Sequence, residues 1–395
     1  MNEVNDPLSR NVKALAAVSL LTDAASEMIY PLLPLFLSTV LGASASMIGT
    51  IEGLAESTAS MLKLASGWWS DRVGRRKPFV VAGYGLAALV RPLMGLAQAP
   101  WQALVVRLSD RTGKGIRTSA RDALLADSAS PAQRGRAFGF LRAGDNAGAV
   151  IGPLVAWVML EMGAVPLRTV FLWAAIPGVL AVVVLVAFVK EKPALRPDTR
   201  TPSPAALRAE RKLGAPFWRY LVVLLAFTLG NSTDAFLLLR ASQVGVPIAI
   251  VPILWAAFSL VKAVCSTPGG ALSDRIGRRP VIVAGWALFA VVYLLFARAT
   301  AAWQAWALFA IYGVSLGISE SVEKALVADL VPAARRGAAY GWYNFVIGIG
   351  ALPASVVFGI VWDRVSPAAA FTMGASLVSA AAIGLLTMVP RSPAE

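Results

Sequence analysis

The sequence predicts an all-α membrane protein with twelve transmembrane helices, arranged as two pseudo-symmetric halves of six helices each. Three observations lead to this prediction: long apolar segments, basic turns on one side only, and motifs that recur in the second half. Of the 395 residues, 57% are hydrophobic and 15% are charged, and the mean hydropathy is +0.67. A soluble chain of this length needs more polar side chains to cover its surface, so much of the apolar surface must face lipid.

The apolar segments have the length of membrane spans, since about 20 helical residues cross a hydrocarbon core of roughly 30 Å. Residues 169–189 and 368–389 carry no charge at all. Continuous apolar runs without alternation favour helices over a β-barrel. In order, the predicted spans are residues 12–37, 44–66, 78–98, 101–124, 136–160, 168–189, 217–239, 246–268, 280–298, 303–327, 337–361 and 367–389.

The positive charges indicate the topology of the chain. The net charge is +14, and Lys and Arg gather in the turns at 72–77, 190–219 and 275–279 but are absent from those at 38–46 and 97–101. Because cytoplasmic loops carry the excess of Lys and Arg, both termini are predicted to be cytoplasmic, in a bacterial-type inner membrane. The same rule accounts for the charge without a nucleic-acid partner.

The residues that usually hold metals or disulfides are scarce. Cys265 is the only cysteine of the sequence, and histidine is absent from it. No disulfide framework is therefore possible within this sequence, and the commonest transition-metal ligand is missing. We expect no metal site.

The segment 190–216 separates two halves. It holds five prolines, several charges and no long apolar run, which indicates a cytoplasmic linker. The predicted domains are a six-helix bundle at 1–189, the linker at 190–216, and a second six-helix bundle at 217–395. Three stretches of the first half recur in the second: 67–76 as 270–279, 123–127 as 325–329, and 134–139 as 336–341.

The first of these repeats resembles the signature of the major facilitator superfamily between helices 2 and 3, although Trp68 and Trp69 depart from it. The resemblance implies the fold of that superfamily and a cytoplasmic gating motif that latches and releases during alternating access. Gly74 and Gly277 allow the sharp turns, and the basic residues have the alternative role of setting topology only. The predicted gating residues are Gly67, Asp71, Arg72, Gly74 and Arg75, with Gly270, Asp274, Arg275, Gly277 and Arg278 in the second half.

Two further patterns resemble features of this superfamily. Gly148, Gly152 and Pro153 in helix 5 would allow close helix packing and a bend. In the superfamily, such a pattern is typical of proton-coupled exporters, so it favours efflux. Arg111 to Gly115 in helix 4 resembles an Arg-x-x-x-Gly pattern linked to proton coupling, with Arg107 as a competing candidate.

Charged groups inside the spans are the strongest functional signal, because each costs roughly 2.5–3.5 kcal/mol at a helix centre. In the superfamily, helices 1, 4, 7 and 10 line the central cavity. For each charge the alternative is a static ion pair between helices. The predicted substrate and proton cavity consists of Asp23, Glu27, Arg107, Asp110, Arg111, Lys114, Arg142, Asp145, Asn146, Asn231, Asp234, Glu320, Glu323 and Asn344.

Asp23 and Glu27 are the first candidates for carrying the coupled proton, followed by Asp145 and Glu320. Asp23 and Glu27 lie four residues apart and hence on one helix face, with no cation one turn away in their own helix. A carboxylate that alternates between dry and wet surroundings can bind and release a proton. The further charges Glu52, Glu56, Lys63 and Lys262 are predicted at the interface between the halves, and Arg91 has no predicted role.

The predicted function is secondary active transport of a small polar or charged solute by alternating access, as proton-coupled efflux. The mixture of anions and cations favours a polar solute over lipophilic drugs. Proton-coupled uptake, multidrug export and a non-transporting receptor or assembly factor are the alternatives. We expect a monomer in the bilayer that uses the proton gradient and no cofactor. Enzymatic activity is not expected, because the hydrolase-like string at 313–317 and the dinucleotide-like string at 83–88 lie inside predicted helices.

Overall fold

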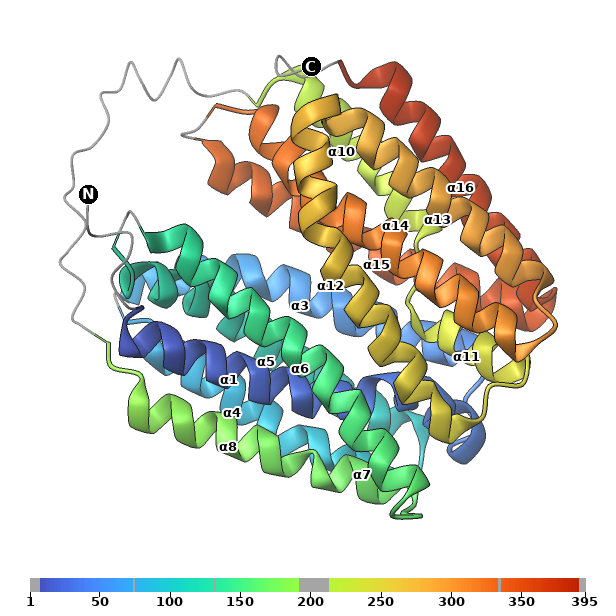
Figure 1. Cartoon of the computed structure of the whole chain (residues 1–395), viewed down its shortest axis with the longest axis horizontal. Coiled ribbons are helices and arrows are strands. Elements are labelled where there is room, and N and C mark those ends of the chain that lie inside the picture. The colour runs from blue at the N-terminus through green and yellow to red at the C-terminus, as the bar shows by residue number, and fades with distance from the viewer. Residues whose placement is uncertain (1–7, 74, 131–132, 192–212, 333–334, 391–395) are drawn as a thin grey trace. The chain divides into compact units, whose positions relative to one another are not determined.

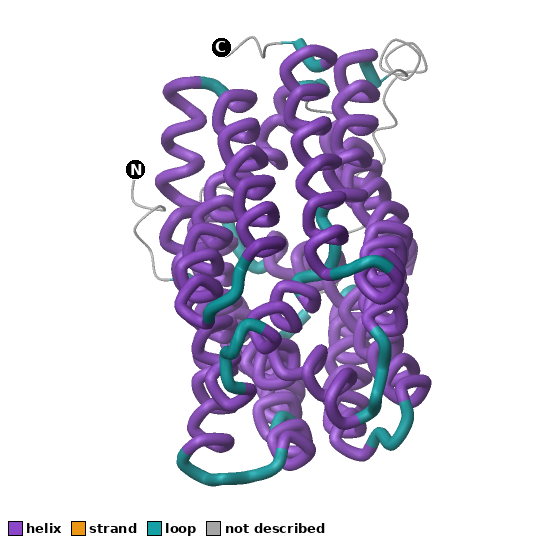
Figure 2. Tube along the Cα trace, turned by 90° about the vertical axis from the view of Figure 1, so that its right-hand side faces the viewer, coloured by secondary structure: helices purple, strands orange, loops and turns teal. Residues whose placement is uncertain are grey.

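The computed structural model describes residues 8–73, 75–130, 133–191, 213–332 and 335–390. Within them every regular element is helical and no strand occurs (Figure 2). The first half contains α1 (Arg10–Ile29), η1 (Tyr30–Leu32), α2 (Leu33–Leu35), η2 (Phe36–Val40), α3 (Ala45–Val73), α4 (Lys77–Val90), η3 (Arg91–Leu96), α5 (Pro100–Asp127), α6 (Arg134–Glu161), α7 (Leu167–Trp173) and α8 (Ala175–Phe188). The second contains α10 (Ala215–Gly230), α11 (Ala235–Gln243), η5 (Ile248–Ile250), α12 (Val251–Ile276), α13 (Arg278–Arg298), α14 (Ala302–Asp329), α15 (Arg336–Arg364) and α16 (Pro367–Met388).

The all-helical membrane fold predicted from the sequence is confirmed. Ten of the described helical segments are long and apolar enough to cross a membrane. The helices α3 and α5, with 29 and 28 residues, also have sufficient length but are too polar for that criterion. The count of twelve spans therefore stays a prediction, which the lengths of α3 and α5 support.

The predicted span ends lie within four residues of the helix ends except at two places. The helices α3 and α12 continue past the predicted residues 66 and 268 to Val73 and Ile276. Both extensions contain charged residues. Hydropathy identifies only the part of a helix inside hydrocarbon, whereas charged residues do not prevent the helix from continuing beyond it.

By its contacts the chain divides into two compact units. The first comprises residues 1–43, 54–194 and 246–259, and the second comprises 44–53, 195–245 and 260–395. The first turns of α3 thus belong to the second unit, and the first turns of α12 belong to the first. The predicted division at the linker 190–216 stays a prediction, since 192–212 lie outside the described residues.

In the first unit, α1 packs against α6 and α8, while α4 packs against α5 and α8 (Figure 1). Glycines at every fourth position of α6 allow the approach to α1. A methyl group on Gly144 or Gly148 would lie 2.7 or 2.5 Å from the backbone oxygen of Ala16 or Leu20, and Gly152 contacts Ala24 in the same way. Small residues thus let these two backbones pack closely, which places α6 directly beside Asp23.

In the second unit, the predicted span 217–239 is interrupted. The helix α10 ends at Gly230, α11 begins at Ala235, and Asn231 to Thr233 are not helical. Asn, Ser and Thr offer their backbone alternative hydrogen bonds, which weakens a helix at this point. Non-helical backbone at membrane depth is tolerated where it is buried in protein or lines a cavity, so the break is a feature of the candidate site.

The same unit contains a helix cap between segments far apart in the sequence. The backbone N–H groups of Ala45 and Ser46 donate to the Asp363 carboxylate at 3.0 and 2.8 Å. An anion at a helix N-terminus satisfies donors that the helix itself leaves unpaired and interacts favourably with the helix dipole. Asp363, at the end of α15, therefore fixes the start of α3.

Candidate functional site

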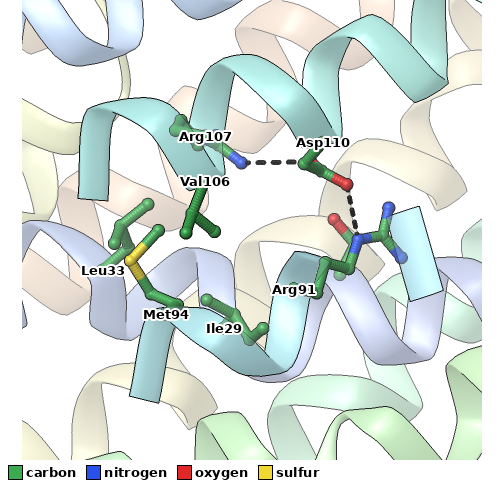
Figure 3. Close-up of a pocket in the computed structure, with 8 residues that line it drawn as sticks. Ile29, Leu33, Arg91, Met94, Val106, Arg107 and Asp110 are labelled. Atoms are coloured by element: carbon green, nitrogen blue, oxygen red, sulfur yellow. Dashed lines mark hydrogen bonds and ion pairs between the residues drawn. The ribbon is translucent and has the colours of Figure 1, made fainter. Parts of the chain in front are cut away.

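A buried ion-pair network joins α1, η3 and α5 in the first unit. Arg91 Nε donates to Asp110 Oδ1 at 2.7 Å and Arg91 Nη1 donates to the Thr22 backbone oxygen at 2.9 Å. Arg107 Nη1 lies 3.7 Å from Asp110 Oδ2 (Figure 3). All three charged side chains are buried. Arg91, which had no predicted role, is thus the main partner of Asp110.

The cavity beside this network is small. Its volume is about 20 Å³, and Ile29, Leu33, Met94 and Val106 contribute apolar walls (Figure 3). A cavity of roughly 10–15 Å³ is needed to hold one water molecule. This space therefore admits about one water and no solute, which favours the static ion-pair alternative for Asp110.

A second network joins α1, α5 and α6. The Ser19 hydroxyl donates to the Asp145 carboxylate, and Arg121 Nη1 donates to Ser19 Oγ at 2.8 Å. Arg121 also lies 3.0 Å from Asp122 Oδ1 and 3.6 Å from Asp145 Oδ1. On the outside, Arg142 Nη1 lies 3.3 Å from Asp145 Oδ2. Asp145 is therefore held between fixed partners.

Asp23 and Glu27 lie one turn apart on α1, and both are half-buried. Glu27 Oε2 accepts a hydrogen bond of 2.7 Å from Trp255 Nε1 of α12. Asp23, by contrast, has neither a hydrogen bond nor an ion pair within the residues that the structure describes. The charges that act on it most strongly are Asp145 and Arg117. Asp23 is thus a membrane-embedded carboxylate with no fixed partner there.

The remaining predicted residues of this unit lie in different surroundings. Arg111 is buried and Lys114 is half-buried on α5, whereas Asn146 is exposed on α6. Arg117, which extends the α5 stripe, lies over the Tyr84 ring at 4.4 Å from the ring centroid. Asn146 therefore lies apart from the buried part of the cluster.

The break between α10 and α11 carries the main polar group of the second unit. Tyr312 Oη of α14 donates to Asp234 Oδ1 at 2.6 Å, and Ser232 Oγ lies 3.4 Å from Tyr293 Oη. Asn231 ends α10, and its backbone N–H donates to the Phe227 oxygen at 2.8 Å. Broken helices of this kind expose backbone groups to bound solutes or ions in other transporters.

A buried carboxylate occupies α14 in the same unit. Glu323 Oε1 accepts from Trp286 Nε1 at 2.8 Å, and Glu323 Oε2 accepts from Tyr343 Oη at 3.0 Å. Both donors are neutral, and Glu323 is only 5% exposed. Glu320, one turn earlier, lies 2.6 Å from Lys262 Nζ and is more exposed. Glu323 and Glu320 therefore have different environments although the sequence groups them together.

Asn344 of α15 takes no part in these contacts. Its side-chain nitrogen donates to the Tyr340 backbone oxygen at 2.7 Å within its own helix. Asn344 follows Tyr343 in the sequence, but only Tyr343 of the two donates to Glu323.

The gating motif of the second half forms a compact set of ion pairs. Arg278 Nη1 lies 2.5 Å from Asp274 Oδ1, and Arg278 Nε lies 3.2 Å from Asp329 Oδ2 of α14. Gly277 has φ +94°, a conformation that glycine adopts readily and other residues rarely do. Gly270 has open space around it and Arg275 is exposed. The repeated aspartate at 329 is therefore a partner of this motif.

The first-half copy is described only in part. Gly74 lies outside the described residues, and so do the surroundings of Gly67 and the side chain of Asp71. Arg72 and Arg75 are exposed. Arg76, one residue further, pairs with Asp127.

The two copies correspond in structure with an offset of 202 residues. Arg76 pairs with Asp127 as Arg278 pairs with Asp329, whereas the motif strings align with an offset of 203. Lys77 Nζ also donates to the Val186 oxygen, and Arg279 Nη2 donates to the Leu386 oxygen. The donors are 202 residues apart and the acceptors are 200 residues apart. The two offsets differ by one residue, so the alignment of the strings assigns Arg278 to Arg75, although by its ion pair Arg278 corresponds to Arg76.

A model of the Major Facilitator Superfamily matches the chain at residues 15–247 and 235–395. The chain belongs to this superfamily. One similar protein is an uncharacterized transporter of this type from Methanocaldococcus jannaschii, 34% identical over 98% of this chain and 96% of that protein.

Two further similarities describe the family context. The multidrug resistance protein MdtG of Enterobacter lignolyticus is 27% identical over 83% of this chain and 77% of that protein. The crystal structure of a D-xylose–proton symporter matches with a TM-score of 0.79 at 14% identity, over 98% of this chain and 99% of that one. At this identity the likeness shows the fold alone. The family predicted from the repeated motifs is confirmed, and the chain is a multi-pass membrane protein of a transporter superfamily.

Several partners of the predicted residues were missed by sequence reasoning. They are the aromatic donors Trp255, Trp286, Tyr312 and Tyr343 and the acceptors Asp127 and Asp329. The recurrence of 123–127 as 325–329 was a signal for the two aspartates. The aromatic residues gave none, because aromatic side chains in a membrane helix are expected in its apolar packing.

Proposed function

We propose that this chain is a secondary transporter of the cytoplasmic membrane that exports a small polar or charged solute in exchange for protons. Superfamily membership supports transport as such. The observation that carries the finer proposal is Asp23, a half-buried carboxylate of α1 near the middle of the candidate span Arg10–Val40, without a hydrogen bond or ion pair in the described part of the chain.

A carboxylate without a fixed partner is suited to proton exchange. Inside a membrane a charged group is costly unless it is paired or hydrated, so Asp23 gains from binding a proton when its surroundings are dry. Arg117 and Arg121 of α5 and Asp145 of α6 act on it electrostatically. The solute and the proton then occupy the same polar region in turn, and the proton gradient drives their exchange. Both termini lie on the cytoplasmic side.

Multidrug export is the second candidate function, because MdtG proteins named for multidrug resistance are among the relatives. The similarity supports export as the direction. The mixture of cations and carboxylates around Asp23 favours a polar solute over a lipophilic one. The polar solute is therefore the first candidate.

The Asp23→Asn variant is expected to abolish export of the solute while leaving the protein in the membrane. Asparagine has nearly the same shape as aspartate but cannot carry the proton. Untargeted mass spectrometry of cells and medium would compare a null strain, the wild type, Asp23→Asn and the exposed control Glu161→Gln at equal membrane levels. A solute that leaves cells only with the wild type and Glu161→Gln is the expected result.

Three outcomes would contradict parts of the proposal. Accumulation of the solute inside cells would reverse the direction to uptake. Equal export by Asp23→Asn would remove Asp23 from the mechanism. If no metabolite differs among the four strains under varied media, the chain would be better explained as a non-transporting membrane protein.

A further inference from the structure

We propose that Arg111 and Lys114 bind an anionic group of the transported solute, a carboxylate or a phosphate. This inference rests on the proposed function and adds the chemical class of the solute. It begins with the cations of α5, which outnumber the carboxylates of that helix. These cations are Arg107, Arg111, Lys114, Arg117 and Arg121.

The other cations of the stripe have contacts on α5 itself or on the neighbouring α4. Arg107 lies 3.7 Å from Asp110, and Arg121 lies 3.0 Å from Asp122. Arg117 lies over the face of the Tyr84 ring, a favourable place for a guanidinium group, and its Nη1 has no hydrogen-bond partner among the described residues. These contacts account for the ends of the stripe but not for its centre.

Arg111 and Lys114 have no ion pair like those of Arg107 and Arg121, and among the described residues neither lies over an aromatic ring as Arg117 does. In the part of the chain that the structure describes, neither side chain forms a hydrogen bond or has a carboxylate within 4 Å of its nitrogens. Arg111 is nevertheless only 8% exposed. Two like charges one turn apart repel each other, and burial of an unpaired charge is costly. Such a pair is stabilised by an anion from outside the protein.

The packing of α5 determines where these two side chains point. A methyl group on Gly113 would lie 2.6 Å from the Gly83 oxygen of α4, and one on Gly115 would lie 3.0 Å from the Ala59 oxygen of α3. Those two faces of α5 are therefore occupied by helices. At 3.6 residues per turn, Lys114 projects from the side between them, and Arg111 lies one turn before it on that side.

Two carboxylates act on the pair without binding it. Arg111 and Lys114 are the cations that act most strongly on Glu27, whose own oxygen accepts from Trp255. Glu56 is the carboxylate that acts most strongly on Lys114, but at more than ion-pair distance. A solute carboxylate or phosphate placed on Arg111 and Lys114 would supply the missing acceptors, because a guanidinium and an ammonium bind such oxyanions well. The nearby Glu27 and Glu56 would also weaken its retention and so assist release.

Binding of inorganic phosphate tests this site without requiring transport. Equilibrium dialysis with radiolabelled phosphate would use the purified full-length protein in detergent, in chloride buffer at constant ionic strength. The wild type is expected to bind phosphate, and Arg111→Gln/Lys114→Gln is expected to bind it roughly tenfold or more weakly. The control Arg10→Gln/Lys13→Gln removes the same two residue types at the same spacing from the exposed start of α1 and should bind as the wild type does.

The exchange variant Arg111→Lys/Lys114→Arg retains both charges and is expected to retain most of the binding. Size-exclusion elution would verify that each variant stays folded. The proposal is overturned if Arg111→Gln/Lys114→Gln binds phosphate as tightly as the wild type, or if the wild type binds none at millimolar concentration. Because the assay measures binding alone, a failure to bind phosphate leaves the transport proposal standing. Conversely, loss of export in Asp23→Asn does not test whether Arg111 and Lys114 bind an anion.

Discussion

Replacing Asp110 by leucine is expected to destabilise the protein by about 3–5 kcal/mol, because removing one partner of a buried ion pair leaves a buried charge uncompensated. Asp110 accepts from Arg91 at 2.7 Å and lies near Arg107, and all three are buried. The measurement is the free energy of unfolding in mixed micelles titrated with denaturing detergent. Leucine has the same number and branching of side-chain heavy atoms as aspartate, although it is larger, and it carries no charge.

Two controls distinguish the effect of breaking the buried ion pair from the effect of removing any carboxylate. Asp122→Leu removes a carboxylate with 36% exposure that pairs with Arg121, and it is expected to cost about 1 kcal/mol or less. The double variant Arg91→Met/Asp110→Leu should recover part of the loss, because it removes both charges together. An Asp110→Leu protein as stable as Asp122→Leu would contradict the buried network.

Replacing Gly148 by valine is expected to destabilise the first unit by about 1–3 kcal/mol and to abolish export, because the added side chain forces α6 away from α1. A Cβ atom at Gly148 would lie 2.5 Å from the Leu20 oxygen and 2.9 Å from Asp23 Cβ. The displacement therefore occurs at the carboxylate on which the proposed transport depends. Stability in micelles and export from cells are the two measurements.

Gly139→Val is the matched control, since Gly139 is a glycine of the same helix with open space around it. Valine has the same intrinsic effect on helix stability at both positions. The two variants therefore differ mainly in the contact with α1. Equal losses of stability in both would show that close packing of α1 and α6 is not what Gly148 provides.

The sequence predicted most helix bounds because hydrophobic length is a local property of the chain. The span 303–327, for example, corresponds to α14 at Ala302–Asp329. It did not predict the interruption at Asn231 to Thr233, although Gly230, Asn231, Ser232 and Thr233 in succession all disfavour a helix. Hydropathy averaged over a span conceals four such residues among apolar neighbours.

The candidate site was predictable as a set of residues but not as a set of contacts. Intramembrane charges are visible in the sequence because they are costly there. Which of them pair depends on how helices pack, so Arg91 could not be matched to Asp110 of the next long helix. Within α5, Asp110 forms an ion pair, whereas Arg111 has no ion pair or hydrogen bond among the described residues. The two residues differ because adjacent side chains of a helix point in different directions.

The proposed exchange of a solute for protons takes place through the region around Asp23. Everted membrane vesicles acidified by respiration, with a fluorescent probe of internal acidity, measure this exchange directly. The solute identified by the export comparison is added outside the vesicles. The account predicts prompt loss of internal acidity with the wild type and with Glu161→Gln, and no response with Asp23→Asn. Uptake of the solute without any change in acidity, or an equal response with Asp23→Asn, would contradict it.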